Sequence, residues 1–161
     1  MVTLRTGLDR DVPAITRLIN AAFEVERFFL DHDRIEAAEV RERLGKGRFI
    51  LAEDSTLAGC VYVELRGERA YIGLLSVDPS RQRSGLGSNL MAAAEEYARA
   101  AGCRFVDLLI VNLRLELPPF YRRRGYVEDG TSPFPAEANP RQPCHFVKMF
   151  KPLRDRNNTI D

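Results

Sequence analysis

Residues 74–88 read Leu-Leu-Ser-Val-Asp-Pro-Ser-Arg-Gln-Arg-Ser-Gly-Leu-Gly-Ser, and this stretch decides the fold. An apolar strand leads into a short basic loop with two glycines, and the loop leads directly into a helix. Apolar residues recur at helical spacing after Gly87, at Leu90, Ala94, Tyr97 and Ala101. We expect Ser80 or Ser84 to cap the start of this helix and Gly102 to end it.

The loop has the properties of an anion-binding site. A helix N-terminus leaves its first amide groups without acceptors and carries partial positive charge. Gly85 and Gly87 let a ligand approach the backbone where a Cβ would stand in the way, and Arg81 and Arg83 add positive charge. The loop lacks the Gly-Lys-Ser/Thr of a P-loop, and Leu90 stands where a dinucleotide fingerprint needs its third glycine. A phosphate-bearing ligand of another kind is therefore expected.

Two segments resemble the signatures of one family. Residues 82–87, Gln-Arg-Ser-Gly-Leu-Gly, fit the pattern Gln/Arg-x-x-Gly-x-Gly/Ala after a strand ending Val-Asp-Pro. This resembles the coenzyme A loop of the GCN5-related N-acetyltransferase (GNAT) superfamily, although an ordinary loop between a strand and a helix is the alternative. The second signature of the superfamily is similar to Phe-Tyr-Arg-Arg-Arg-Gly-Tyr at 120–126. Pro118 and Pro119 depart from that pattern, so we expect the short helix there to begin at about Pro118.

Composition and charge favour one ordinary globular domain. The chain has 161 residues and a net charge of +1, too balanced for nucleic acid to be the main partner. No apolar run is long enough to span a bilayer, and no signal-peptide pattern is present, so neither a membrane nor secretion is expected. Three widely spaced cysteines indicate reduced thiols in the cytoplasm rather than a disulfide framework or a metal site. We expect a single domain at 1–153 and a loose tail at 154–161.

The periodicity predicts an α/β (α+β) fold. Strands are expected at 2–5, 49–52, 57–65, 70–77, 105–111 and 144–150, and helices from Asp9 or Asp11 to about Phe23, at 34–44, after Gly87 and near 118–124. The apolar strand at 105–111 is expected to be covered on both faces and to lie parallel to 70–77. The resemblance implies the acyl-CoA N-acyltransferase fold: a mixed, mostly antiparallel sheet of six to seven strands with helices on both faces.

The resemblance also implies a binding site for acetyl-CoA as co-substrate. Its pyrophosphate would accept hydrogen bonds from the backbone N–H groups of the loop, namely those of Gln82, Arg83, Ser84, Gly85, Leu86, Gly87 and Ser88. Leu75 and Val77 would pair with the pantetheine arm, and the Leu75 N–H would polarise the thioester carbonyl as an oxyanion-hole donor. Asn112 would touch the arm from the other side.

Catalytic candidates are less evenly supported. Tyr121 matches the position at which many family members hold a general acid; the alternative is that it packs beneath the coenzyme with Phe120. Some members place a glutamate base at the position of Tyr71, which is unsuited to that role. Glu64 is the nearest carboxylate that could act as the base. Other candidates for removing the amine proton are Glu53, His145 and a water chain, whereas Cys60 and Cys144 lack the His partner that a nucleophile needs.

The resemblance implies acetyl transfer to a primary amine by direct attack in a ternary complex. A small-molecule amine is the first choice, and a protein N-terminus or lysine is the second. Residues 24–33, rich in acids and aromatics, are either a wall of the acceptor pocket or a helix end followed by a solvated turn. A different acyl group, a non-catalytic acetyl-CoA sensor and an interaction module remain open, as does a homodimer.

Overall fold

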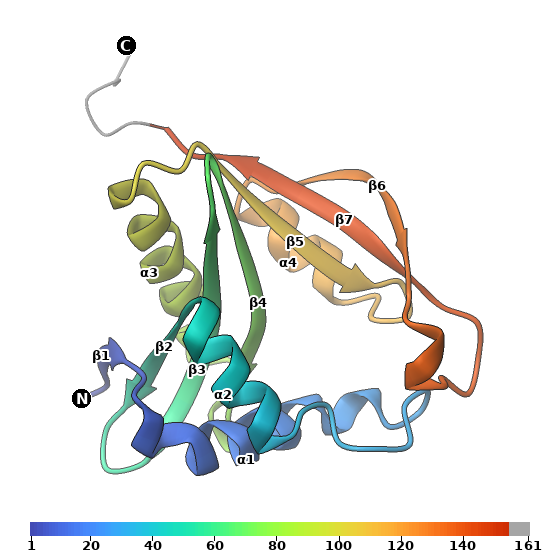
Figure 1. Cartoon of the computed structure of the whole chain (residues 1–161), viewed down its shortest axis with the longest axis horizontal. Helices are drawn as coiled ribbons and strands as arrows, with labels where there is room; N and C mark the ends of the chain where they lie inside the picture. The colour runs from blue at the N-terminus through green and yellow to red at the C-terminus, as the bar shows by residue number, and fades with distance from the viewer. Residues whose placement is uncertain (155–161) are drawn as a thin grey trace.

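The computed structural model describes residues 1–154, so the tail expected at 154–161 lies, apart from Arg154, outside the described residues. One open sheet of seven strands has the order β1-β2-β3-β4-β5-β7-β6, and only β4 and β5 run parallel to each other (Figure 1). The strands are β1 Thr3–Thr6, β2 Arg48–Glu53, β3 Leu57–Arg66, β4 Arg69–Val77, β5 Phe105–Val111, β6 Val127–Pro133 and β7 His145–Pro152. The helices are α1 Val12–Ala22, α2 Ala37–Lys46, α3 Leu86–Ala100 and α4 Leu117–Arg123. The expected mixed, mostly antiparallel sheet is confirmed.

Helices cover both faces of the sheet because each has one apolar stripe to bury. On one face α1 buries Ile15 and Ile19 in a cluster that includes Phe49 and Tyr62 of β2 and β3. On the other face α3 buries Leu90, Met91, Ala94 and Ala98, in a cluster that also takes in Tyr121 of α4. The coenzyme loop predicted from the sequence lies between β4 and the second of these layers.

The second helix begins and ends later than the sequence predicts. It was expected at 34–44, but Asn20 exchanges two 3.0 Å hydrogen bonds with the backbone of Ile35 and so keeps that residue out of the helix. Gly45 was expected to close the helix, but it lies inside it. The terminating residue is Gly47, where an added Cβ would lie 2.5 Å from the Val63 carbonyl oxygen. The close approach of β3 therefore selects the second glycine.

The predicted serine cap of α3 is wrong. Gly85 holds the N-cap position in a left-handed conformation (φ +84°), which a glycine adopts without steric cost. Ser84 instead donates a 2.6 Å hydrogen bond to the carbonyl of Arg81, and the Ser80 hydroxyl lies 2.8 Å from the Asp78 carboxylate. The other end follows the prediction, because Gly102 stands just beyond the helix with φ +93°.

The prediction that β5 is covered on both faces is also wrong. From Phe105 to Ile110 the residues of β5 alternate between exposed or partly exposed and buried positions, and Leu109 is 41% exposed. The reason is the placement of α1, which packs on β3 and β4 and leaves this face of β5 without a helix.

The central pair of strands is joined over a short distance only. Pairing of β4 with β5 is restricted to Arg69–Tyr71 opposite Phe105–Asp107. Beyond that point the two strands diverge, and Figure 1 shows them separating toward the loop before α3 and the segment before α4. β5 remains paired with β7 along its whole length, so a gap opens in the middle of the sheet.

Candidate active site

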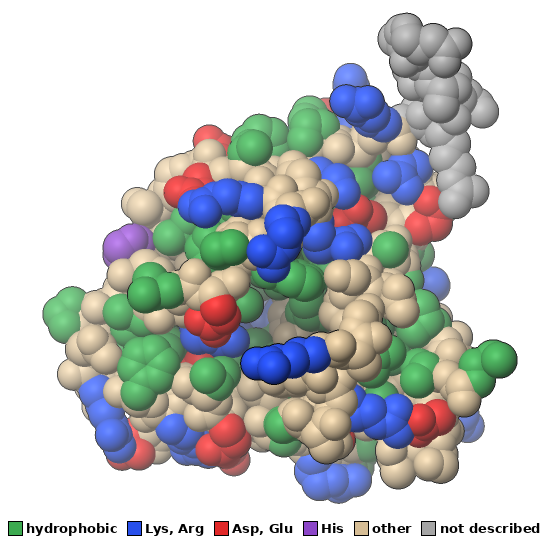
Figure 2. Space-filling model, turned by 180° about the vertical axis from the view of Figure 1, so that it is seen from behind, with side chains coloured by type: hydrophobic (Ala, Val, Ile, Leu, Met, Phe, Trp, Pro, Cys, Tyr) green, Lys and Arg blue, Asp and Glu red, His purple; other side chains and the backbone are tan. Residues whose placement is uncertain are grey.

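The gap between β4 and β5 gives one edge of β4 free backbone groups. From Ile72 to Val77 this strand is paired with β3 on one side and has no partner strand on the other. Seen from behind, the molecule has a hollow near the middle of its surface, with Lys and Arg side chains above and below it (Figure 2). An extended ligand entering the gap would meet this edge of β4 as it would meet a neighbouring strand.

A bulge in β4 changes which way its residues point. Gly73 lies opposite Tyr62 and Ser76 opposite Cys60, so Leu74 and Leu75 together face the single residue Val61. Leu74 adopts φ +54°, which is uncommon for a residue with a side chain. Its side chain joins the α1 layer, whereas Leu75 and Val77 pack against the α3 layer. The bulge therefore shifts the alternation of the strand by one residue.

The loop before α3 presents a row of free amide donors. In the described part of the chain, none of the seven backbone N–H groups from Gln82 to Ser88 has a hydrogen-bond acceptor; the first helical bond runs from the N–H of Asn89 to the carbonyl of Gly85. Arg83 (φ +69°) is exposed, and residues 1–154 contain no acidic partner for it. Arg81, in contrast, forms a 2.6 Å ion pair with Asp54 and is held at the β2–β3 turn. Of the two arginines expected to aid anion binding, Arg83 is therefore the available one.

The predicted binding residues meet at the start of α3. A Cβ at Gly87 would lie 3.7 Å from Cζ of Phe120 and 4.0 Å from both the Leu75 and Val77 side chains. The structure thus brings the loop, the free edge of β4 and the first turn of α4 together at one end of the gap. Tyr121 follows Phe120 directly.

Tyr121 is buried and held by aromatic neighbours. Its ring packs edge-on against Phe120 and Tyr126, at centroid distances of 5.0 and 5.7 Å. Tyr126 is fixed in turn, because its hydroxyl donates a 3.0 Å hydrogen bond to Glu95. The Tyr121 hydroxyl makes no hydrogen bond within residues 1–154, and burial raises its pKa to about 12. A phenol that is protonated, and whose O–H group has no acceptor among these residues, is suited to donate a proton.

Asn112 joins the end of β5 to the start of β7. Its side-chain oxygen accepts a 2.8 Å hydrogen bond from the N–H of His145, and its own N–H donates to the His145 carbonyl at 2.9 Å. Within the described residues its side-chain NH2 has no partner, which leaves two donors at the β5 side of the gap.

The candidate carboxylates Glu64 and Glu53 are both engaged in ion pairs, and His145 lies exposed at the start of β7. Glu64 accepts hydrogen bonds from Tyr62 (2.7 Å) and Arg66 (2.5 Å), which keep its pKa below the usual range. Glu53 pairs with Arg5 at the β1 edge of the sheet, far from the gap. Tyr71 extends along its strand, so that a Cβ on Gly73 would lie 2.6 Å from its hydroxyl at the start of the gap.

Sequence reasoning missed a buried ion pair beside the gap. Glu26, in the 3-10 turn Phe23–Glu26, accepts a 2.7 Å hydrogen bond from Arg114 in the segment between β5 and α4, and both side chains are nearly buried. Burial raises the pKa of Glu26, although Arg114 acts in the opposite direction. The two residues are 88 positions apart in the chain, and no local pattern signals such a pairing.

The acidic stretch at 24–33 carries less free charge than its sequence indicates. Glu24 and Asp33 both pair with Arg27, and Asp31 pairs with Arg141. With Glu26 also paired, this stretch does not present the unpaired acids that an acceptor wall for cations was expected to offer.

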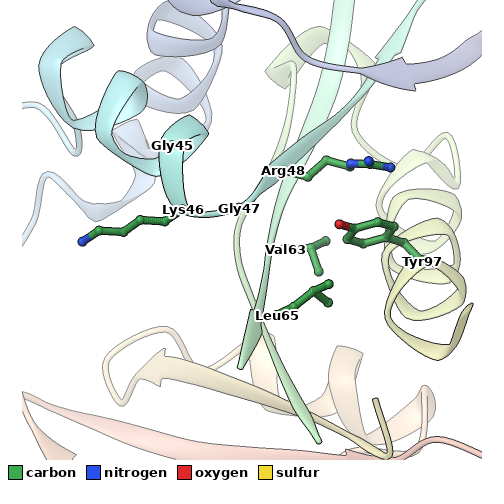
Figure 3. A pocket seen from close by; sticks show the side chains of 7 residues that line it. All are labelled: Gly45, Lys46, Gly47, Arg48, Val63, Leu65 and Tyr97. Carbon is green, nitrogen blue, oxygen red and sulfur yellow. The ribbon is translucent and has the colours of Figure 1, made fainter. Parts of the chain in front are cut away.

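A separate hollow of about 280 Å³ lies between the end of α2, β2, β3 and α3 (Figure 3). The guanidinium of Arg48 stacks on the Tyr97 ring at 4.2 Å, whereas the Lys46 side chain points away from these two residues. None of the residues expected to bind or react lines this hollow, so it is not part of the candidate site.

Within residues 1–154, no helix has the length and apolar character to cross a membrane, and no cluster of three acidic, His or Cys side chains could hold a metal ion.

A mixed sheet with a central gap, a bulged free strand edge and a row of amides at a helix N-terminus defines the acyl-CoA N-acyltransferase class of fold. The chain belongs to the acetyltransferase (GNAT) family, whose model matches residues 12–126. The superfamily resemblance seen in the sequence is thereby confirmed.

Three known proteins illustrate what this chain is similar to. Mycothiol acetyltransferase of Clavibacter michiganensis subsp. michiganensis is 36% identical over 73 residues, which cover 45% of this chain and about a quarter (24%) of that protein. The ribosomal-protein-S18-alanine N-acetyltransferase of Escherichia coli superimposes with a TM-score of 0.77 at 16% identity, covering 100% of this chain and 99% of the other. The acetyltransferase-like yncA of Salmonella typhimurium, solved with its cofactor acetyl-CoA, gives 0.71 at 18% identity, over 96% and 95%. These two structures support the fold.

Proposed function

We propose that this protein is an acetyl-CoA-dependent N-acetyltransferase that transfers the acetyl group to a primary amine by direct attack in a ternary complex. The observation that carries the proposal is the free edge of β4, which runs from the bulge at Leu74 to the amide row at 82–88. This arrangement fits coenzyme A at both ends: amide donors suit the pyrophosphate, and an unpaired strand edge suits the amide-containing pantetheine arm.

Each predicted binding residue has a role in this proposal. Leu75 and Val77 pair with the arm from β4, while the side-chain NH2 of Asn112 donates to it from the β5 side. Arg83 adds a cation beside the phosphates. The loop contributes the N–H groups of Gln82, Arg83, Ser84, Gly85, Leu86, Gly87 and Ser88.

Chemistry would take place where β4 and α4 face the gap. The Leu75 N–H stabilises the oxyanion that forms when the amine attacks the thioester carbonyl, and Tyr121 protonates the departing thiolate. The amine loses its proton through water, with Glu64 as the nearest candidate carboxylate on the acceptor face. The hydrogen bonds from Tyr62 and Arg66 that lower the pKa of Glu64 also make it a weak base.

A small-molecule amine is the acceptor that the surroundings of the gap favour. Two segments that flank the acceptor side are fastened to each other: His32 contacts the carbonyl of Ala138 at 2.9 Å, and the N–H of Arg141 donates to the Phe29 carbonyl at 2.8 Å. The ion pair between Arg141 and Asp31 adds a third connection. Figure 1 shows the segment before α2 reaching the segment between β6 and β7. These connections restrict the room for a polypeptide, which a protein acetyltransferase would need to admit.

The test is calorimetric titration with acetyl-CoA and coenzyme A, followed by thiol release with three groups of acceptors: small amines, lysine-containing peptides and peptides with free N-termini. We expect saturable binding of both ligands and thiol release with small amines. Release with peptides alone would transfer the acceptor assignment to proteins. Binding without release with any amine would indicate an acetyl-CoA sensor, and absence of binding would refute the proposal.

A further inference from the structure

Ser76 is a buried polar residue whose role the proposed mechanism leaves open. Its side chain is only 1% exposed, yet it lies on a strand between apolar neighbours. Its hydroxyl donates a 2.9 Å hydrogen bond to the carbonyl oxygen of Leu74, two residues earlier. A buried hydroxyl needs a partner, and this one is satisfied at the residue that forms the bulge.

Cys60 reaches the same carbonyl from β3. Its sulfur lies 3.9 Å from the Leu74 oxygen, and the residue is fully buried opposite Ser76 in the strand register. Burial raises the pKa of the Cys60 thiol to about 12, so it remains a protonated donor. The neighbouring Gly59 permits this close approach of the strands, because a Cβ there would lie 3.0 Å from the Ser76 carbonyl oxygen.

The planarity of the peptide bond transmits this contact to Leu75. The Leu74 carbonyl and the Leu75 N–H belong to one trans peptide unit and point in opposite directions. Because the Ser76 hydroxyl and the Cys60 thiol fix the direction of the carbonyl, they also fix the direction of the Leu75 N–H, which points the opposite way. The hydrogen bond from Ser76 thus also holds Leu74 in its unusual left-handed conformation.

We propose that Ser76, assisted by Cys60, is a positioning residue that aims the Leu75 N–H at the thioester carbonyl. The inference rests on the proposed function, in which that N–H is the oxyanion donor. Neither side chain touches the reacting atoms; both act by fixing the orientation of one peptide unit. Because donors that are oriented in advance need no reorganisation during the reaction, their loss affects the rate more than binding.

The test compares Ser76→Ala with the wild type in kinetics and in the infrared spectrum of bound acetyl-CoA labelled with 13C at the carbonyl. We expect kcat to fall roughly tenfold, less than the hundred- to thousandfold typical when an oxyanion donor is removed outright, with KM for acetyl-CoA almost unchanged. The carbonyl stretch, lowered by the hydrogen bond in the wild type, should return toward its value in water. Ser76→Cys, which keeps a weaker donor, should give intermediate values and serves where the alanine variant does not fold.

Thr16→Ala is the matched control, since it removes a hydroxyl that donates a 2.7 Å hydrogen bond to a carbonyl inside α1. It should leave kcat and the carbonyl stretch unchanged. A Ser76 variant that folds, binds acetyl-CoA and keeps both the wild-type kcat and carbonyl stretch would overturn this inference alone. Failure of the wild type to bind acetyl-CoA would overturn the proposed function and this inference with it.

Discussion

Replacing Gly85 by valine tests whether the backbone conformation before α3 creates the phosphate site. Gly85 has φ +84°, and a Cβ added there would meet no atom within 4 Å. A valine side chain therefore has room at this position, but its backbone disfavours the left-handed conformation. Holding valine in that conformation costs about 1–3 kcal/mol of stability. For a domain of this size each kcal/mol lowers the melting temperature by roughly 2–4 °C. The strained residue would relax away from the left-handed region and misdirect the amides of Leu86 and Gly87.

The same helix provides a matched control at its other end. Gly102 has φ +93° and equally has no atom within 4 Å of an added Cβ, so Gly102→Val should cost similar stability. Misdirecting one or two charge-assisted hydrogen bonds, each worth about 1.5–3 kcal/mol, should weaken coenzyme A binding about tenfold to a hundredfold in the Gly85 variant only. Calorimetric titration below both melting temperatures measures this difference. Equal affinity in the two variants would refute the assignment of the amide row to the phosphates.

Three further outcomes are expected. Tyr121→Phe should reduce turnover about tenfold or more while coenzyme affinity stays close to wild type, because the phenyl ring preserves the packing and only the hydroxyl group is lost; near-wild-type turnover would contradict the role of a general acid. In native protein treated with a thiol reagent, Cys144 should react first, and mass spectrometry should find the two buried cysteines modified only after unfolding. Hydrogen bonds from Arg5 hold the pKa of Asp11 at about 2, so Asp11→Asn should lower stability above pH 4, and the difference should disappear as the pH falls toward 2 in denaturant titrations.

The local sequence pattern was sufficient to predict most of the helices and strands and the candidate site residues near α3. Helical spacing after Gly87 and the apolar run at 105–111 have strong periodicity, and both correspond to elements of the structure. The residues from Leu75 to Ser88 are contiguous or nearly so in the chain, and the strand–loop–helix order itself brings them together. The motif at 120–126 was the additional pattern needed to predict that Tyr121 lies near these residues.

Contacts between distant segments could not be predicted in this way. The Glu26–Arg114 pair joins residues 88 positions apart, and the exposed Leu109 depends on where α1 packs. The start of α2 depends on Asn20, a residue of the preceding helix. In each case a tertiary contact overrides the local preference, and a single sequence gives no signal of that contact.

The divergence of β4 from β5 also bears on how the unpaired edges of the sheet could associate with other molecules. Every open sheet has two outer edges, where unpaired backbone groups can recruit strands from other molecules. This sheet has two further stretches of unpaired edge, one on β4 and one on β5, but they face each other within the molecule instead of facing a neighbouring molecule. These central edges are thereby kept apart from the two outer edges of the sheet, and in the proposed function the pantetheine arm is what pairs with the β4 edge.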